Sequence, residues 1–206
     1  MADNHNHDDS VEDLKKRRFL TNITAGFGAV GVGIAATPFV LSMQPSERAK
    51  NAGAPVFFDF SRLDEGRMAK VEWRGKPVVI LRRSPEMMQG LDEIKDKLAD
   101  PNSLVSTQPV YAQNNQRADA AKPELLVMEG VCTHLGCSPV EKLALGPDPE
   151  MGEDSKGGFF CPCHGSKFDL AGRVYKNVPA TTNMAVPPYK YVGDVITIGE
   201  DEGRTA

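Results

Sequence analysis

This chain has few cysteines and no excess of positive charge, and both shortages narrow its possible functions. Its 206 residues include four cysteines, too few for a small fold held together mainly by disulfides. The formal net charge is −4, whereas nucleic-acid-binding domains usually carry a basic surface, so no nucleic-acid partner is expected. With 40% hydrophobic and 25% charged residues, the composition is that of an ordinary folded protein, with room for one globular domain and an appendage.

Charge is missing altogether from one long segment near the N-terminus. Residues 19–46 contain no charged side chain, and about 20 apolar residues are needed for a helix to cross the hydrocarbon core of a bilayer. The segment is too long and too rich in glycine for a buried soluble helix. It is also longer than the apolar core of a cleaved secretory peptide, about 7–15 residues. We therefore predict an uncleaved transmembrane anchor over residues 19–43.

The polar and basic N-terminus, residues 1–18, predicts the orientation of the anchor. It ends in Lys-Lys-Arg-Arg, and basic residues beside a membrane span stay in the cytoplasm. Everything after Met43 would then lie outside, in the periplasm of a bacterium. The KKRRFL run also resembles a twin-arginine signal, which exports folded proteins, although its spacing makes the pair Lys16-Arg17.

Two polar segments flank the anchor. Residues 1–10 contain two histidines among Asn and Asp, and we expect a solvated, disordered tail rather than a metal site. Residues 44–54 have no apolar periodicity and contain Pro45 and Gly53, which predicts a linker to a domain over residues 55–206. The linker is either a passive connector or a hinge.

The domain is predicted to be mainly β, a small antiparallel fold with one helix. Ser84-Pro85 is a good helix start, and Met87, Leu91, Ile94 and Leu98 repeat at helical spacing until Asp100-Pro101 stops the helix. Hairpin turns are expected at Arg74–Pro77 and Gly193-Asp194, and loops at 102–123 and 143–158. The expected strands are PVFFDF, VEW, VVIL, LLVM, GFF, AGRVY, YKYV and VITI.

All four cysteines and two of the four histidines lie in two short boxes, CTHLGC at 132–137 and CPCHGS at 161–166. Each box supplies one Cys–His pair to a common site. Thiolates suit iron–sulfur clusters and zinc, while imidazoles suit zinc, copper and iron. The donors therefore permit either a Cys₂His₂ zinc site or a mixed-ligand iron–sulfur cluster. The pairs are Cys132 with His134 and Cys161 with His164.

The arrangement of the donors favours the cluster. Structural zinc sites usually take like residues in pairs, Cys-x-x-Cys followed by two histidines, whereas here each loop supplies one of each kind. In Rieske centres, two-iron and two-sulfur clusters, two histidines replace two cysteines on one iron. Neutral imidazoles leave such a cluster less negative, so it accepts an electron more readily. The free ring nitrogens can also carry a proton, which suits the oxidation of a quinol.

Cys137 and Cys163 remain after the donors are assigned. The predicted topology places them outside the cytoplasm, where disulfides persist, so we predict a bond that ties the two boxes together. The alternative is two free buried thiols.

The boxes, with both additional cysteines, closely resemble those of the high-potential Rieske iron–sulfur subunits of bacterial cytochrome bc1 complexes (ubiquinol–cytochrome c reductase). WRGKPVVILRR at 73–83 is also similar to that family, as are the basic N-terminus, the single span, the linker and the β domain. The resemblance implies a Rieske-type fold with one [2Fe–2S] cluster. It also implies a subunit of the bacterial inner membrane that takes an electron and a proton from ubiquinol at cytochrome b. The electron would pass to cytochrome c1, within a dimeric complex, and the subunit would not be a complete enzyme alone.

The resemblance further implies a role for single residues. Cys132 and Cys161 would bind one iron and His134 and His164 the other, with the disulfide between the remaining two cysteines beside them. Four further residues would surround the cluster. Leu135 would lie at the exposed tip that docks on cytochrome b, and Ser166 would donate a hydrogen bond to a cluster sulfide. Phe168 stands where many relatives have a tyrosine that bonds a cysteine sulfur, and Pro179 would lie in the loop that covers the cluster.

Two other classes of protein stay open on the sequence. Rieske ferredoxins and oxygenase-type Rieske domains share the Cys-x-His and Cys-x-x-His spacing, but they usually lack the second pair of cysteines and the membrane span. A relative of the bc1 subunits that oxidises another donor, such as arsenite or plastoquinol, is a variant of the interpretation as a bc1 subunit. A structural zinc protein is the third interpretation.

Overall fold

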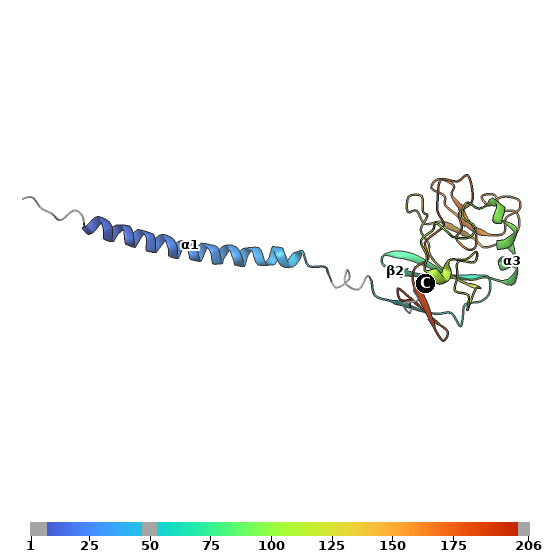
Figure 1. The fold of residues 1–206 in the computed structure, drawn as a ribbon, viewed down its shortest axis with the longest axis horizontal. Coiled ribbons are helices and arrows are strands. Elements are labelled where there is room, and N and C mark those ends of the chain that lie inside the picture. The colour runs from blue at the N-terminus through green and yellow to red at the C-terminus, as the bar shows by residue number, and fades with distance from the viewer. Residues whose placement is uncertain (1–7, 47–52, 202–206) are drawn as a thin grey trace, which may run out of the picture. The chain divides into compact units, whose positions relative to one another are not determined.

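The computed structural model describes residues 8–46 and 53–201, and the chain forms two compact units, Met1–Lys50 and Asn51–Ala206 (Figure 1). The first unit contains helix α1, Asp8–Ser42, whose stretch from Glu12 onward is long and apolar enough to cross a membrane. Because α1 begins at Asp8, residues 8–10 are helical and the prediction of disorder was wrong there. The rest of that tail, and linker residues 47–52, lie outside the described residues.

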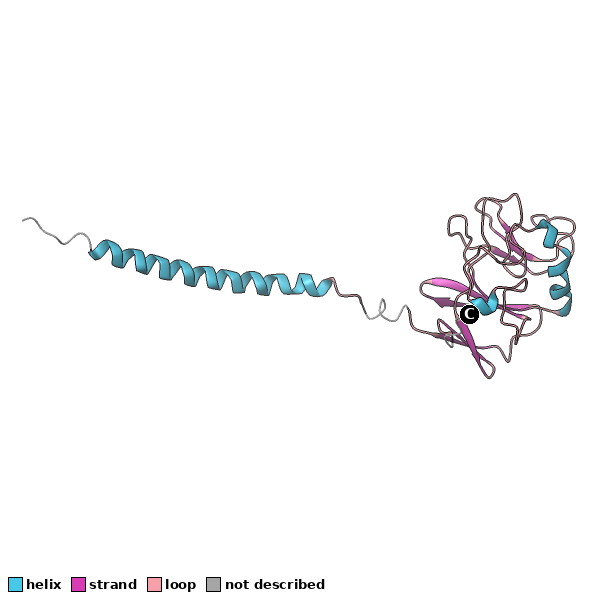
Figure 2. Cartoon of the chain, in the orientation of Figure 1, coloured by secondary structure: helices cyan, strands magenta, loops and turns pink. Residues whose placement is uncertain are grey.

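Within residues 53–201, the second unit contains three small antiparallel sheets of three strands each, joined by long loops (Figure 2). The strand orders are β1-β9-β8, β2-β3-β4 and β5-β6-β7. The predicted mainly β class with an N-terminal helix is therefore confirmed. The strands are β1 Val56–Asp59, β2 Arg67–Trp73, β3 Lys76–Arg82, β4 Leu125–Glu129, β5 Val140–Lys142, β6 Gly158–Phe160, β7 Lys167–Phe168, β8 Tyr189–Val192 and β9 Val195–Ile198.

Both predicted hairpins are confirmed. Trp73 pairs with Lys76, so β2 and β3 are joined by the two-residue turn Arg74-Gly75, and Pro77 lies inside β3 rather than in the turn. Val192 pairs with Val195 across the turn at Gly193-Asp194. Two-residue loops match the twist of paired strands, which is why a glycine beside a polar residue marked them in the sequence.

The predicted helix begins as expected but is shorter. Helix α3, Pro85–Glu93, is capped by Ser84, whose Oγ accepts a hydrogen bond from the Met87 N–H at 3.3 Å. A short 3₁₀ turn, η1 Lys95–Lys97, follows, and Leu98 is extended and bridges to Tyr175. The apolar repeat was misleading because Leu98 is buried through this bridge rather than on a helix face.

The expected strand AGRVY, residues 171–175, is also wrong, since the chain turns there instead. The Asp169 carboxylate accepts hydrogen bonds from the backbone N–H groups of Ala171 and Arg173, which folds the segment back on itself. Only isolated bridges remain at its end, such as Phe168 with Val174. An Asp that bonds the backbone two residues on favours a turn over a strand.

The loop 102–123 is partly packed into the domain, although Leu104, Val105 and Val110 are exposed. It contains the 3₁₀ turn η2, Val110–Ala112, and the fully buried Arg117. The Arg117 guanidinium donates to the carbonyl oxygens of Ala171 and Gly172. The other terminal nitrogen of Arg117 donates to the Gln108 side chain, while its buried Nε has no hydrogen-bond partner among the described residues.

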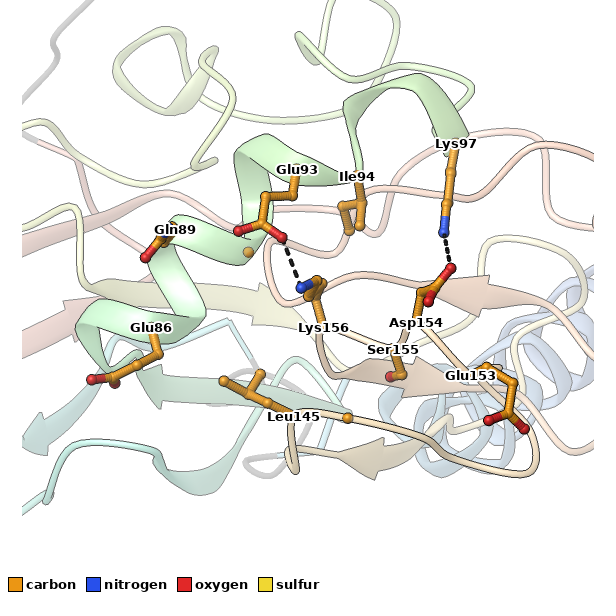
Figure 3. Close-up of a pocket in the computed structure, with 12 residues that line it drawn as sticks. Glu86, Gln89, Glu93, Ile94, Lys97, Leu145, Glu153, Asp154, Ser155 and Lys156 are labelled. Carbon is orange, nitrogen blue, oxygen red and sulfur yellow. Dashed lines mark ion pairs between the residues drawn. The ribbon is translucent and has the colours of Figure 1, made fainter.

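The loop 143–158 lies against α3, and the two enclose a pocket of about 560 Å³ (Figure 3). Two ion pairs connect the loop to the helical segment, Lys156 with Glu93 at 2.7 Å and Lys97 with Asp154 at 3.7 Å. Exposed pairs of this kind contribute at most about 1 kcal/mol each. None of the predicted site residues lines this pocket.

Candidate metal centre

The third sheet brings the two boxes together. Box 1, residues 132–137, lies between β4 and β5, and box 2, residues 161–166, connects β6 to β7. Because β5 pairs with β6, with Val140 opposite Phe160, the chain leaving box 1 runs beside the chain entering box 2. Two loops that are 29 positions apart in sequence, counted from Cys132 to Cys161, are thus neighbours in space.

The boxes have the same backbone hydrogen bonds. In box 1 the Cys132 N–H donates to the Cys137 carbonyl at 2.7 Å, and the Gly136 N–H donates to the Cys132 carbonyl at 3.0 Å. In box 2 the bonds from residue 161 to residue 166 and from residue 165 to residue 161 measure 2.8 and 2.9 Å. The fifth residue of each box is a glycine with positive φ, 82° at Gly136 and 77° at Gly165. A left-handed residue is needed to close each loop, and glycine adopts it without strain.

These loops bury the thiols and leave the imidazoles near the surface. Cys132 and Cys161 are 1% and 2% exposed, and both are free thiols. His134 is half-buried and His164 is exposed, with ring centroids 4.9 Å apart and ring planes perpendicular. The four donors thus form an inner sulfur pair and an outer nitrogen pair.

The sulfur atom of Cys132 accepts hydrogen bonds within the site. Burial raises the pKa of the Cys132 thiol, while hydrogen bonds from the His134 backbone N–H and from the Ser166 hydroxyl act in the opposite direction. Such donors would stabilise negative charge on a ligand sulfur once the thiol has lost its proton.

Cys137 and Cys163 form a disulfide between the two boxes, as predicted. Their sulfur atoms and that of Cys161 lie within 4.8 Å of one another. Sulfur atoms already bonded to each other are not thiolates, so this group of three is not a metal site in itself. It places the disulfide directly beside the free thiol of Cys161.

A third segment, residues 178–183, contacts both boxes. The Ala180 N–H donates to the Ser166 Oγ at 3.0 Å, and the Thr133 Oγ1 donates to the Thr182 carbonyl at 2.6 Å. Pro179 is exposed and belongs to this segment, next to box 2. The sequence interpretation did not identify Thr133, whose position between two donors was the only available signal.

Two further predicted residues have opposite surroundings. Leu135, between His134 and Gly136, is 70% exposed. Phe168, in β7, is fully buried and belongs to the same apolar core as Cys132 and Cys161. An exposed leucine at a loop tip is available for contact with a partner, whereas Phe168 is available only to the interior.

The donors present fit a two-iron cluster better than a zinc ion. Two free buried thiols and two neighbouring imidazoles match the mixed-ligand set in which each iron receives one kind of donor. Backbone and hydroxyl donors already aim at a ligand sulfur, a common feature of iron–sulfur sites.

Comparison with known proteins agrees with this site. A family model described as "Rieske [2Fe-2S] domain" matches residues 55–190, and one described as "Ubiquitinol-cytochrome C reductase Fe-S subunit TAT signal" matches residues 5–46. The chain is similar to proteins named ubiquinol-cytochrome c reductase iron-sulfur subunit. That of Allochromatium vinosum is 54% identical over 189 residues, 91% of this chain and 90% of the relative. That of Blastochloris viridis is 41% identical over 188 residues, 91% and 94% of the two chains.

Those relatives and both family models cover nearly the whole chain, including the N-terminal helix and the two boxes. The chain therefore belongs to the family of ubiquinol-cytochrome c reductase iron-sulfur subunits and carries a Rieske [2Fe–2S] domain.

Proposed function

We propose that this chain is the iron–sulfur electron-transfer subunit of a respiratory quinol–cytochrome c reductase. It takes one electron and one proton from ubiquinol at the quinol-oxidation site of cytochrome b and passes the electron to cytochrome c1. When bound, the cluster supplies a one-electron acceptor of relatively high potential. The protein supplies the ligands, the proton acceptor and the docking surface, and it is not a complete enzyme alone.

Cys132 and Cys161 hold the inner iron and His134 and His164 the outer iron. The burial of both thiols and the adjacent positions of both imidazoles support this assignment. Sulfur donors kept away from water are protected from oxidation and exchange, while the imidazoles face the side from which a quinol approaches.

The two imidazoles are suited to accept a proton. A histidine bound through one ring nitrogen keeps the other free to accept a hydrogen bond from a quinol hydroxyl and then its proton. His164 is exposed and His134 half-buried, so both are within reach of a partner's bound quinol.

Leu135 is the docking residue on cytochrome b. Its side chain is 70% exposed although it stands between a proposed ligand and the glycine that closes box 1. Burying a leucine against an apolar surface contributes about 1.5–3 kcal/mol, enough to favour a short-lived complex. The exposed Pro179 covers the neighbouring side of box 2.

Helix α1 anchors the subunit in the bacterial inner membrane. The basic residues 15–18 near its start favour a cytoplasmic N-terminus, which places residues 55–206 in the periplasm. Residues 44–54 act as a hinge that lets the cluster domain reach cytochrome b and cytochrome c1 in turn, within a dimeric complex. The twin-arginine signal suits a domain that is folded around its cofactor before export.

The observation that carries this proposal is the pair of cross-linked boxes, each contributing one thiol and one imidazole. Its test is purification of the full chain from detergent-solubilised membranes. We expect b-type and c-type haems to co-purify and the preparation to reduce cytochrome c with ubiquinol. A chain that purifies without haem proteins, with membranes lacking it still oxidising ubiquinol at the normal rate, would contradict the proposal.

A further inference from the structure

Residues 180–183 form a bridge behind the two boxes. The Ala180 N–H reaches the Ser166 Oγ in box 2, and the Thr182 carbonyl accepts the hydroxyl of Thr133 in box 1. The disulfide links the same two boxes through their cysteines. The boxes therefore have one covalent connection and a second, hydrogen-bonded one that depends on where this bridge lies.

The bridge is fixed by the side chain of Asn183, which is 1% exposed. The Asn183 Oδ1 accepts a hydrogen bond from the Val174 N–H at 2.9 Å. The Nδ2 donates to the Asp100 carbonyl at 3.0 Å and to the Ser103 Oγ at 2.9 Å. The Asn183 backbone N–H donates to the Ser106 Oγ at 3.1 Å. The side-chain amide thus joins its own segment to the nearby Val174 and to the 100–106 loop, which is about 80 positions away in sequence.

We propose that Asn183 is a positioning residue for the cluster, which sets the direction of the Ser166 hydroxyl through the backbone of Ala180. This inference rests on the proposed cluster ligands and not on the identity of the quinol or of the partner subunits.

The Ser166 oxygen accepts the Ala180 N–H, so its own proton is directed elsewhere. A hydrogen bond from Ser166 acts to lower the pKa of the Cys132 thiol, against the effect of burial, so the sulfur of Cys132 is the acceptor that we assign to this proton. Hydrogen bonds to the sulfur atoms of such a cluster stabilise its reduced, more negative state and raise its reduction potential. If the bridge moves, Ser166 loses the partner that orients it, and its hydroxyl is free to rotate.

A residue that only supported the fold would behave differently. Loss of several buried hydrogen bonds destabilises any domain, by about 1 kcal/mol or more for each bond. Stability alone does not therefore identify a positioning role. A change in midpoint potential that disappears when Ser166 is absent does identify it, because the effect must then pass through Ser166.

The experiment is a double-mutant cycle on the full chain, with the midpoint potential measured by redox titration of membranes and electron paramagnetic resonance. The variants are Asn183→Ala, Ser166→Ala and both together. Ser106→Ala weakens the same bridge without altering the amide, and it decides the question if Asn183→Ala does not fold. Asn102→Ala, an exposed asparagine in the adjacent loop, is the matched control.

We expect Asn183→Ala to lower the midpoint potential in the direction of Ser166→Ala, and to add almost nothing when Ser166 is already alanine. Ser106→Ala should give a smaller shift of the same sign, and Asn102→Ala none. An unchanged potential in Asn183→Ala, or in Ser106→Ala where the first does not fold, would overturn the inference, as would a fully additive shift. Absence of a mixed-ligand [2Fe–2S] signal in the unaltered protein would instead refute the cluster ligands themselves.

Discussion

The two boxes have the same backbone conformation but carry their functional side chains at different positions. Both close with the same two hydrogen bonds and with a left-handed glycine at the fifth position. The histidine is third in box 1 and fourth in box 2, while the disulfide cysteine is sixth in box 1 and third in box 2. Backbone geometry is therefore set by the first and fifth residues, and the others are free to carry different chemistry.

The largest expected effect comes from removing the metal-binding cysteine that stands at the first position of each box. Cys161→Ser replaces a buried thiol with a hydroxyl that binds iron poorly, so we expect complete loss of the cluster. Cys132→Ser should behave identically. Iron analysis and the electron paramagnetic resonance spectrum of the reduced protein would measure this, with the exposed Ser138→Ala as control. A retained spectrum in either cysteine variant would remove that residue from the ligand set.

Loss of the covalent link should come next. The disulfide closes a sequence separation of 26, for which loop-closure entropy predicts about 3.5 kcal/mol of stabilisation. The double variant Cys137→Ala with Cys163→Ala should lower the free energy of unfolding by about that amount, as measured by thermal or denaturant unfolding of the domain in membranes. If the double variant were as stable as the unaltered protein, the boxes would be held together by other contacts alone.

The fourth position separates the boxes most clearly, because Leu135 stands there in box 1 and His164 in box 2. Leu135→Ala should leave the cluster and the stability unchanged but slow ubiquinol oxidation about tenfold, since about 1.4 kcal/mol of docking energy corresponds to that factor. The measurement is cytochrome c reduction by membranes. Val140→Ala, at an exposed apolar residue outside the boxes, should have no effect, and an equal loss there would show that the tip is not special.

The shared fifth position should respond equally in both boxes. A side chain at Gly136 or Gly165 would meet nothing within 4 Å, so the only cost of alanine is the left-handed backbone, about 1 kcal/mol. Gly136→Ala and Gly165→Ala should therefore lower the free energy of unfolding by similar amounts. Clearly unequal values would mean that the two loops are not equivalent in energy.

The smallest effect is expected at Phe168, which follows box 2. No residue after box 1 is predicted to have a corresponding role. Phe168 is fully buried within the core that contains both free thiols. We therefore expect a hydroxyl introduced there to donate a hydrogen bond to a sulfur atom. Phe168→Tyr should raise the midpoint potential in a redox titration. Phe57→Tyr, at an exposed phenylalanine outside that core, is the control. An unchanged midpoint in Phe168→Tyr would count against this role.

Much of this architecture was predictable because it depends on local signals. The two hairpins and the start of α3 were marked by turn residues and by a serine cap before proline, and the apolar helix by its length. The two boxes were visible because all the cysteines fall within them.

What escaped prediction depends on contacts between distant segments. Leu98 looked helical because its burial has the right spacing, although it comes from a bridge to Tyr175. The loop 102–123 looked exposed because nothing local indicates that Arg117 donates to carbonyls more than 50 positions away. The partners of Asn183 in the 100–106 loop are even more remote than those of Arg117, so no sequence pattern could have revealed them.

The central claim is that two thiols and two imidazoles, one of each from either box, bind a two-iron cluster. Metal analysis combined with electron–nuclear double resonance of the reduced, purified protein tests it most directly. We expect two iron atoms for each chain and two distinct histidine nitrogens coupled to the unpaired electron. A colourless protein with one zinc ion for each chain, or an iron spectrum without nitrogen coupling, would contradict it.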